Sequence, residues 1–464
     1  MKKFTSVFVF TFVFSIFSFA QNINTVAGNY SLGAGYGGDG GPATAAQLHF
    51  PAGVVLDSVN NMYIADQQNN EVRKVNGVTG IITTIAGSHT FASGFSGDGG
   101  QATSAQLFGP LAVSIDSSDN VYVADNVNSV IRKINQTTGI ITTVAGIGTV
   151  LSYSGDGGQA TAAELFRPTG MAVDGKGNLY IADCLNSIIR KVDHTTGIIN
   201  TIAGIPKTPG YSGDGGLASA AELKYLQNLT LDGKGNLYIA DAGNNVVRYI
   251  DATTGNISTL AGTGAPGYYG DGGQATAAEL DNLTDVTLDA MGNVYIGDFD
   301  NQVVRMVTVS SGIISTIAGN HVQGFSGDGG PATAAELYEP IGGAFDKAGN
   351  FYIVDESNNV IREISTGIST GTRLVQNSND LLTMNIFPNP VNNDLTLVYT
   401  LPNTETKATL YLYNSLGQLI RCTFITAHSG ILNEDVSGIM RGVYYYSIVS
   451  GLGIKATNKF IINR

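Results

Sequence analysis

The chain has 464 residues and a formal net charge of −13 at pH 7, which disfavours nucleic acid and anionic membrane surfaces as partners. Charged residues make up only 13% of it, Gly occurs 60 times and Trp is absent, a composition typical of a turn-rich β protein with more than one domain or a repeat array. The two cysteines, Cys184 and Cys422, lie far apart in segments of different character, so a disulfide framework is not expected.

The first 20 residues have the pattern of a secretory signal peptide. Lys2 and Lys3 precede an apolar run, and Ala20 is a small residue of the kind that stands before a cleavage point. An N-terminal membrane anchor is the alternative, but the run is short for a span, and no later stretch is long and apolar enough to cross a bilayer. We therefore expect cleavage between Ala20 and Gln21, and a mature chain without a transmembrane segment.

Residues 21–370 contain a repeat of about 58 residues in six copies, each with the same internal spacing. Each copy begins with an Asp in a "GDGG" element: Asp39, Asp98, Asp156, Asp214, Asp271 and Asp328. A second Asp ends a "YIAD"-like run 27 residues later: Asp66, Asp125, Asp183, Asp241, Asp298 and Asp355. An Arg follows after seven more residues: Arg73, Arg132, Arg190, Arg248, Arg305 and Arg362.

Four short β-like runs fill each copy; in the first they are "GVVLD", "MYIAD", "VRKV" and "ITTIAG". Six units of four strands predict an all-β fold, a six-bladed β-propeller. The run "INTVAG" at 23–28 matches a fourth strand, and the last copy lacks one. We therefore expect the N-terminal strand to close the last blade; a linear array is the main alternative.

The repeated polar residues suggest structural roles, because an active site is normally unique. Asp66 should lie opposite Glu71 in a hairpin, with Arg73 diagonal to it as an ion pair within the blade. The "GDGG" Asp is interpreted as an acceptor of local N–H bonds in a glycine turn. The pattern Thr44-x-x-Gln47 and its five relatives fit a helix-capping box. No cofactor or metal is expected, although weak cation binding on the acidic rim stays open.

The repeats resemble the NHL-repeat family of propellers, through the "PxGVxxD…GNxYIADxxNNxIR" core at 168–190 and again around 340–362. The units here are longer, because each adds a "GDGGxATxAxL" segment. Family members are mostly binding platforms, and a few related propellers are lyases or lactonases. The resemblance therefore implies a ligand face on the rim that carries the "GDGG" loops.

Residues 384–464 resemble the type A C-terminal sorting domain of the Bacteroidota type IX secretion pathway. The motifs are "NIFPNPVNNDLTL", "YNSLGQLI", "DVSGIMRGVYYYSI" and "KATNKFIINR", in that order. Alternating strands also predict a small β-sandwich here, with 371–383 as a linker. The resemblance implies export by the type IX machinery, followed by release or attachment at the outer-membrane surface. An ordinary appended sandwich is the alternative.

Function should lie where the six copies differ. The residue before the first strand is small in four copies but is Asn228 and Asp285 in two adjacent blades, which makes these two the candidate ligand site near the channel mouth; neutral drift in the two blades is the alternative. A three-His zinc site would need His49, His89 and His321 to converge. His194 and His428 are the other imidazoles. Cys184 could be exposed in its turn but has no local base.

We therefore expect a secreted or surface-bound module, without catalytic residues, that binds an extracellular glycan, peptide or protein. A metal-assisted lyase or lactonase that uses the same propeller face is the alternative.

Overall fold

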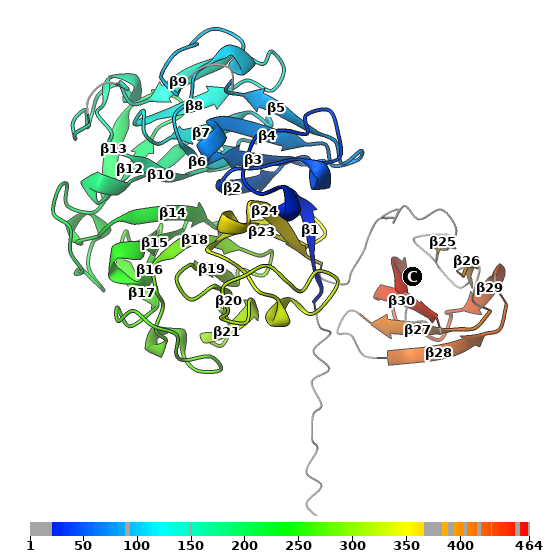
Figure 1. The fold of residues 1–464 in the computed structure, drawn as a ribbon. Helices are drawn as coiled ribbons and strands as arrows, with labels where there is room; N and C mark the ends of the chain where they lie inside the picture. Colours follow the sequence, from blue (N-terminus) through cyan, green and yellow to red (C-terminus); the bar gives the residue numbers. More distant parts are fainter. Residues whose placement is uncertain are drawn as a thin grey trace, which may run out of the picture.

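The computed structural model describes residues 21–88, 93–148, 151–365, 383–387, 394–401, 406–414, 419–427, 429–450 and 455–462. Six four-stranded antiparallel sheets precede two further sheets in the C-terminal region. Figure 1 shows the six sheets arranged about a common centre in chain order, from blue to yellow. The six-bladed propeller predicted from the repeat is therefore confirmed.

The blades repeat four strand positions from the centre outward. The first strands are β2 (Pro51–Leu56), β6 (Pro110–Ile115), β10 (Pro168–Val173), β14 (Leu226–Leu231), β18 (Leu283–Leu288) and β22 (Pro340–Phe345). The second strands are β3 (Met62–Asp66), β7 (Val121–Asp125), β11 (Leu179–Asp183), β15 (Leu237–Asp241), β19 (Val294–Asp298) and β23 (Phe351–Asp355). The third strands are β4 (Glu71–Val75), β8 (Val130–Ile134), β12 (Ile188–Val192), β16 (Val246–Ile250), β20 (Val303–Thr308) and β24 (Val360–Ile364). The fourth strands are β5 (Ile82–Ala86), β9 (Ile141–Ala145), β13 (Ile199–Ala203), β17 (Ile257–Ala261), β21 (Ile313–Ala318) and, for the sixth blade, β1 (Ile23–Ala27).

The apolar core lies between neighbouring blades. Tyr122 and Ala124 of the second blade, for example, share one buried cluster with Leu179 and Ile181 of the third. The second strands are buried on both faces, because each is covered by a blade on either side. This explains why "MYIAD" and its relatives read as nearly continuous apolar runs rather than as alternating ones.

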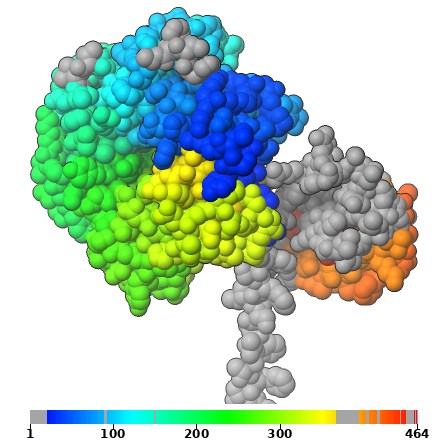
Figure 2. Space-filling model, in the orientation of Figure 1, coloured from blue at the N-terminus to red at the C-terminus, as the bar shows by residue number. Residues whose placement is uncertain are grey.

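The N-terminal strand β1 closes the ring. It pairs antiparallel with β24, with Ile23 opposite Ile364, and completes the sheet β1-β24-β23-β22. Ile23 is fully buried against Val304 and Leu337. Figure 2 shows the blue first residues against the yellow last blade. The closure predicted from the two incomplete ends is confirmed, and a linear array is excluded.

The "GDGG" connectors run along the outer edge of the blade that follows them. In the first blade, Gly40 N–H donates to Ile82 O at 2.8 Å, and Ile82 N–H donates back to Gly41 O at 3.0 Å. A short 3-10 turn follows and packs its alanines between two blades. These turns are η2 (Ala43–Ala45), η4 (Ala102–Ser104), η5 (Ala160–Ala162), η7 (Ala218–Ala220), η9 (Ala275–Ala277) and η10 (Ala332–Ala334).

The predicted capping boxes are wrong. Thr44 lies inside η2, and the residue before the turn, Pro42, makes no side-chain cap. The N–H groups that a Thr44 cap would satisfy are already bonded, since Ala46 N–H donates to Ala43 O at 3.2 Å and Gln47 N–H donates to Gly37 O at 3.3 Å. The Thr hydroxyl is therefore left without a free N–H donor from which it could accept.

Each repeated Arg is fully buried between both repeated aspartates of its blade. The inner ion pair, between the Arg and the Asp that ends the second strand, was predicted. Asp66 is opposite Glu71, and Arg73 Nη1 lies 3.1 Å from Asp66 Oδ2. The outer pair corrects a prediction, because Arg73 Nη2 lies 2.5 Å from Asp39 Oδ1. The "GDGG" Asp therefore accepts from an Arg 34 residues away and from Thr84 N–H, rather than from the N–H groups of its own turn.

The same arrangement holds in all six blades. The outer pair measures 2.5–2.8 Å and the inner pair 3.1–3.6 Å. The guanidinium also lies over an aromatic ring of the connector, 4.9 Å from the Tyr36 centroid in the first blade. Burial raises the pKa of the inner carboxyls, to about 7 in Asp183 and about 6 in Asp125, although an Asn amide, a backbone N–H and the Arg oppose the rise.

The C-terminal residues form two sheets. One is β25 (Thr383–Phe387), β26 (Asp394–Thr400) and β29 (Ser429–Asp435); the other is β28 (Leu419–Ile425), β27 (Ala408–Asn414), β30 (Gly442–Ser450) and β31 (Lys455–Ile462). Leu397 of the first sheet and Leu410 and Tyr446 of the second share one buried core. This is the predicted β-sandwich. Residues 371–382 of the predicted linker and residues 1–20 of the predicted signal peptide lie outside the described residues.

We expect Arg190→Met to lower the free energy of unfolding by about 3 kcal/mol or more, because Asp183 would stay buried without its cation. Urea denaturation of the full chain measures the change. Lys176→Met is the matched control, since it removes an exposed charge from a turn of the same blade. Equal effects of the two substitutions would contradict a structural role for the buried Arg.

We expect Ile23→Ala to destabilise the propeller by about 2–4 kcal/mol, as for other large-to-small core changes. Ile23 is fully buried at the ring closure, whereas Asn24 on the same strand is partly exposed. Asn24→Ala should therefore change the urea midpoint little. If both variants had the stability of the wild type, β1 would not stabilise the closed ring.

Candidate functional site

The first strands of the blades surround a central channel. They contact one another in a closed cycle, from β2 through β22 and back to β2. The channel contains a cavity of about 560 Å³. This volume falls within the range of small-molecule sites in proteins.

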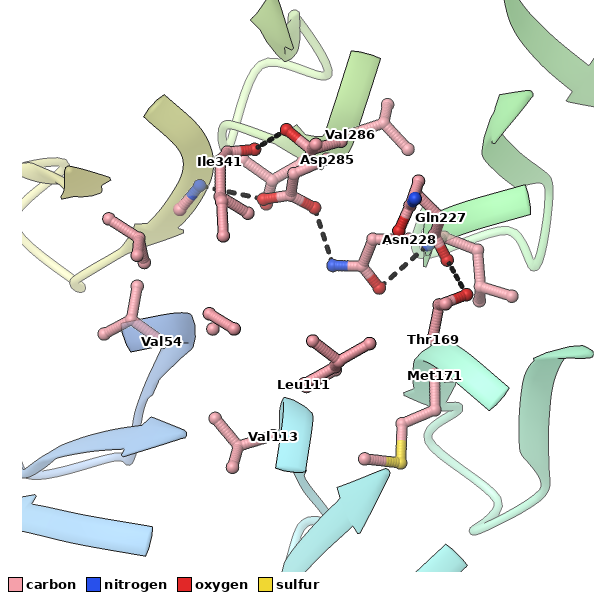
Figure 3. Close-up of a pocket in the computed structure, with 18 of the residues that line it drawn as sticks. Val54, Leu111, Val113, Thr169, Met171, Gln227, Asn228, Asp285, Val286 and Ile341 are labelled. Carbon is pink, nitrogen blue, oxygen red and sulfur yellow. Dashed lines mark hydrogen bonds between the residues drawn. The ribbon is translucent and has the colours of Figure 1, made fainter. Parts of the chain in front are cut away.

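The two sides of this cavity differ in polarity. Thr169, Gln227, Asn228, Thr284 and Asp285 come from the third to fifth blades and supply polar groups. Ala52, Val54, Leu111, Val113 and Ile341 come from the sixth, first and second blades and are apolar. Figure 3 shows the Asn228–Asp285 side facing Val54, Leu111 and Val113 across the cavity. A ligand with one polar and one apolar edge would match this lining.

Asn228 and Asp285 are in direct contact. Asn228 Nδ2 donates to Asp285 Oδ1 at 2.6 Å, and Gly343 N–H donates to the other carboxylate oxygen at 2.8 Å. Asn228 Oδ1 accepts from Leu229 N–H at 2.9 Å. The sequence placed these residues in adjacent blades at the channel, but it did not predict the bond between them. A β-bulge near the start of each first strand turns these side chains toward the channel.

Two glycines leave room for this pair. A Cβ atom on Gly170 would lie 2.4 Å from Asn228 Oδ1, and one on Gly342 would lie 2.5 Å from Asp285 Cβ. Both distances are far below ordinary contact. The small residues at this position in the third and sixth blades therefore accommodate the polar residues in the fourth and fifth.

Asp285 is only 5% exposed, and burial raises its pKa to about 6, although Asn228 and the N–H of Gly343 oppose the rise. A group with this pKa releases its proton just below neutral pH. The two side chains together offer an acceptor edge and one further amide donor to a ligand in the channel.

The channel mouth carries a second set of residues, which the sequence analysis missed. One residue before each first strand adopts a positive φ: Phe50, Gly109, Arg167, Tyr225, Asn282 and Glu339. The residue after each "YIAD" Asp lies beside it at the rim: Gln67, Asn126, Cys184, Ala242, Phe299 and Glu356. Of these, Asn126, Arg167, Cys184, Asn282, Phe299 and Glu356 line the cavity. These positions vary from blade to blade while the repeat residues on either side stay the same, and this variation in the sequence could have identified them.

The histidines do not gather in the described residues. His49 lies beside Phe50, whereas His321 stacks on Tyr268 and its Nδ1 lies 2.8 Å from Asn301 O. No group of three potential metal ligands occurs in the described part of the chain. His89 and His428 lie outside it, so the metal-assisted lyase or lactonase remains an untested alternative that zinc analysis of purified protein would decide.

Cys184 is buried rather than exposed, and burial raises the pKa of its thiol to about 12. A thiol with this pKa is protonated at neutral pH and is a poor nucleophile.

We expect the stability difference between wild type and Asp285→Asn to depend on pH. The pKa of Asp285 is about 6 in the folded chain and about 3.9 in the unfolded one. Its contribution is therefore full below about pH 4 and is lost as the pH rises through about 6, by roughly 3 kcal/mol. Urea denaturation of both proteins between about pH 4 and 8 measures this. Parallel pH profiles would show that Asp285 is not titrating there.

Comparisons with known proteins agree with both parts of this architecture. Residues 385–463 match the model of the secretion system C-terminal sorting domain, and residues 151–208 match the teneurin NHL domain. No helix among the described residues is long and apolar enough to cross a membrane.

Curated relatives share the propeller region. The chain is 28% identical to human teneurin-1 over 342 residues, which covers 65% of this chain and 12% of teneurin-1. It is 27% identical to the chloroplastic protein SUPPRESSOR OF QUENCHING 1 of Arabidopsis thaliana over 283 residues, 59% of this chain and 26% of that protein. It is 23% identical to human NHL repeat-containing protein 2 over 323 residues, 62% of this chain and 43% of that protein. The chain thus spans less than half of each relative.

Solved structures share the fold. A protein of unknown function from Bacteroides thetaiotaomicron has a TM-score of 0.56 at 18% identity, over 74% of this chain and 75% of that chain. An auxiliary nutrient binding protein from Bacteroides ovatus has a TM-score of 0.54 at 17% identity, over 74% and 77%. The six repeats, the closed ring and these matches show a six-bladed propeller that is similar to NHL-repeat proteins, followed by a domain that matches the type IX secretion sorting domain.

Proposed function

We propose that this protein is a non-catalytic binding module that is exported through its sorting domain and binds an extracellular ligand in the propeller channel. The sorting domain implies export to the cell surface or the surroundings. The ligand would be a glycan, a peptide or an exposed part of a protein. The signal peptide predicted at residues 1–20 would begin the same route.

One observation carries this proposal: the scaffold repeats six times, whereas the channel does not. The buried Arg contacts both of its aspartates in every blade. In contrast, the channel position holds small residues in four blades and the bonded pair Asn228 and Asp285 in two. Asp285 is buried without the Arg partner that the structural aspartates have, and burying a charge without a cation is unfavourable, which favours a role in binding.

The fold is compatible with such a role. Two of the solved structures that share it, from Bacteroides thetaiotaomicron and Bacteroides ovatus, are described as auxiliary nutrient binding proteins. The cavity of about 560 Å³ would enclose a small ligand or one end of a longer one.

Glycan and peptide arrays probed with the full mature chain test the proposal. We expect saturable binding that the double variant Asn228→Gly and Asp285→Gly weakens by about tenfold or more, because it removes the polar edge of the channel. Glycine stands at this position in three other blades, as Gly53, Gly170 and Gly342, so the backbone should tolerate it.

Ala112→Gly is the matched control, since it changes the same ring position on the apolar side. It should leave binding unchanged, and thermal melting should show all variants folded. Unchanged binding by the folded double variant would place the ligand elsewhere, and absence of saturable binding on either array would argue against a binding module.

A further inference from the structure

The channel mouth carries a basic residue and an acidic residue on opposite sides. Arg167 belongs to the third blade and Glu356 to the sixth, three blades away around a ring of six. Both line the same cavity. Neither residue belongs to the repeated ion-pair network, so their charges are not needed to hold the blades together.

Arg167 has no acidic partner within the described residues. Its Nη1 donates only to the neutral amide oxygen of Asn126, at 3.3 Å. Its backbone φ is +55°, a conformation that long side chains rarely adopt. Gly109 fills the same corner in the second blade, so the fold does not require Arg here. Four other blades also hold a non-glycine residue with positive φ at this position, so what distinguishes Arg167 is its charge: it is a half-buried cation over the cavity with no acidic partner among the described residues.

Glu356 is likewise unpaired in the part of the chain that the structure describes. It begins η11 (Glu356–Asn358) directly after Asp355. Ser357 Oγ donates to the neighbouring Glu339, but no described group donates to the Glu356 carboxylate. Burial and then the charge of Glu339 raise the pKa of Glu356 to about 8. A cationic group at this rim would relieve both effects.

Between the two charges, the cavity offers a polar and an apolar side. Asp285 and Asn228 lie deeper in the channel, and Leu111 and Val113 face them. A neutral ligand would leave the Arg167 cation without a partner, and a purely anionic ligand would be repelled by Asp285 and would leave the Glu356 carboxyl without a partner. A ligand with an anionic and a cationic end fits the whole arrangement.

We propose that the channel binds zwitterions of the short-peptide class, with the peptide carboxylate on Arg167 and the peptide ammonium group on Glu356. This proposal rests on the binding function proposed above and specifies its ligand. The planar guanidinium suits a carboxylate, because it can donate two parallel hydrogen bonds. The ends of an extended tripeptide lie up to about 10 Å apart, and its side chains would contact the apolar side of the cavity.

The test uses a library of tripeptides with free ends, the same library N-acetylated, and the same library with C-terminal amides. Binding to the full mature chain is measured by thermal shift and by saturation-transfer NMR. We expect the free-ended library to bind, and each blocked library to bind about tenfold more weakly or worse, because each loses a charge-assisted hydrogen bond.

Two substitutions assign the ends. Arg167→Gln should remove the preference for a free carboxylate and keep the preference for a free ammonium group. Glu356→Gln should do the reverse. Each altered selectivity is a change that general unfolding would not produce. Gln occurs as Gln67 at the position of Glu356 in the first blade, so this substitution suits the fold.

Lys176→Gln and Glu336→Gln are the matched controls. Lys176 lies in the turn between first and second strands, and Gln47 and Gln106 occupy the position of Glu336 in other blades. Both controls should keep wild-type selectivity. Equal binding of the free and blocked libraries, or no binding of free-ended peptides, would overturn this inference. Binding of glycans in the array would in that case still support the general binding function.

Discussion

A buried arginine held between two aspartates is the interaction on which the rest of the ring depends. Arg73 joins three segments of one blade: the connector through Asp39, the end of β3 through Asp66, and its own strand β4. Removing a guanidinium from water is costly, and its partners offset that cost only when nearly all of its donors are bonded. The backbone oxygens of Gln47 and Gly37 accept the remaining Nη donors at 3.3 Å. Both of these acceptors belong to the connector, so the network links the path of the connector to the blade.

This arrangement separates architecture from recognition. The network uses the connector and the second and third strands, and it leaves the first strands free of structural charges. Residues at the third position of a first strand face the channel and contact mainly the neighbouring first strands. Asn228 and Asp285 therefore take part in no ion pair of the network, and Gly170 and Gly342 in the neighbouring blades leave room for them. A sixfold scaffold can in this way enclose a channel that is not sixfold.

The architecture was predictable because the same pattern of strand and turn residues occurs in six copies. Strand runs, turn residues and the two incomplete ends were enough for the blades and their closure. The partner of Asp39 was not predictable in this way, because it is 34 residues away and depends on the connector folding over the outer edge of the sheet. The capping boxes failed for a related reason: the N–H of Gln47 bonds to the carbonyl of Gly37, farther back in the connector, instead of to the Thr44 hydroxyl. Local sequence patterns predict hydrogen bonds within a short segment, whereas here hydrogen bonds between more distant residues determine the structure.

The candidate site likewise contains some residues that the sequence indicated and others that the structure revealed. Asn228 and Asp285 stood out because a polar residue replaced a small one at a fixed repeat position. The rim residues differ from blade to blade in the sequence, but only the structure shows that several of them line the cavity, beside residues with positive φ. The hydrogen bond from Asn282 N–H to Asn245 of the preceding blade, 2.9 Å long, shows how this corner is held. Asn70 and Asn359 bond the corners of the second and first blades in the same way, each at 2.8 Å. Because the strained corners are fixed by neighbouring blades, the mouth is organised before any ligand arrives, and little conformational freedom is left to lose on binding.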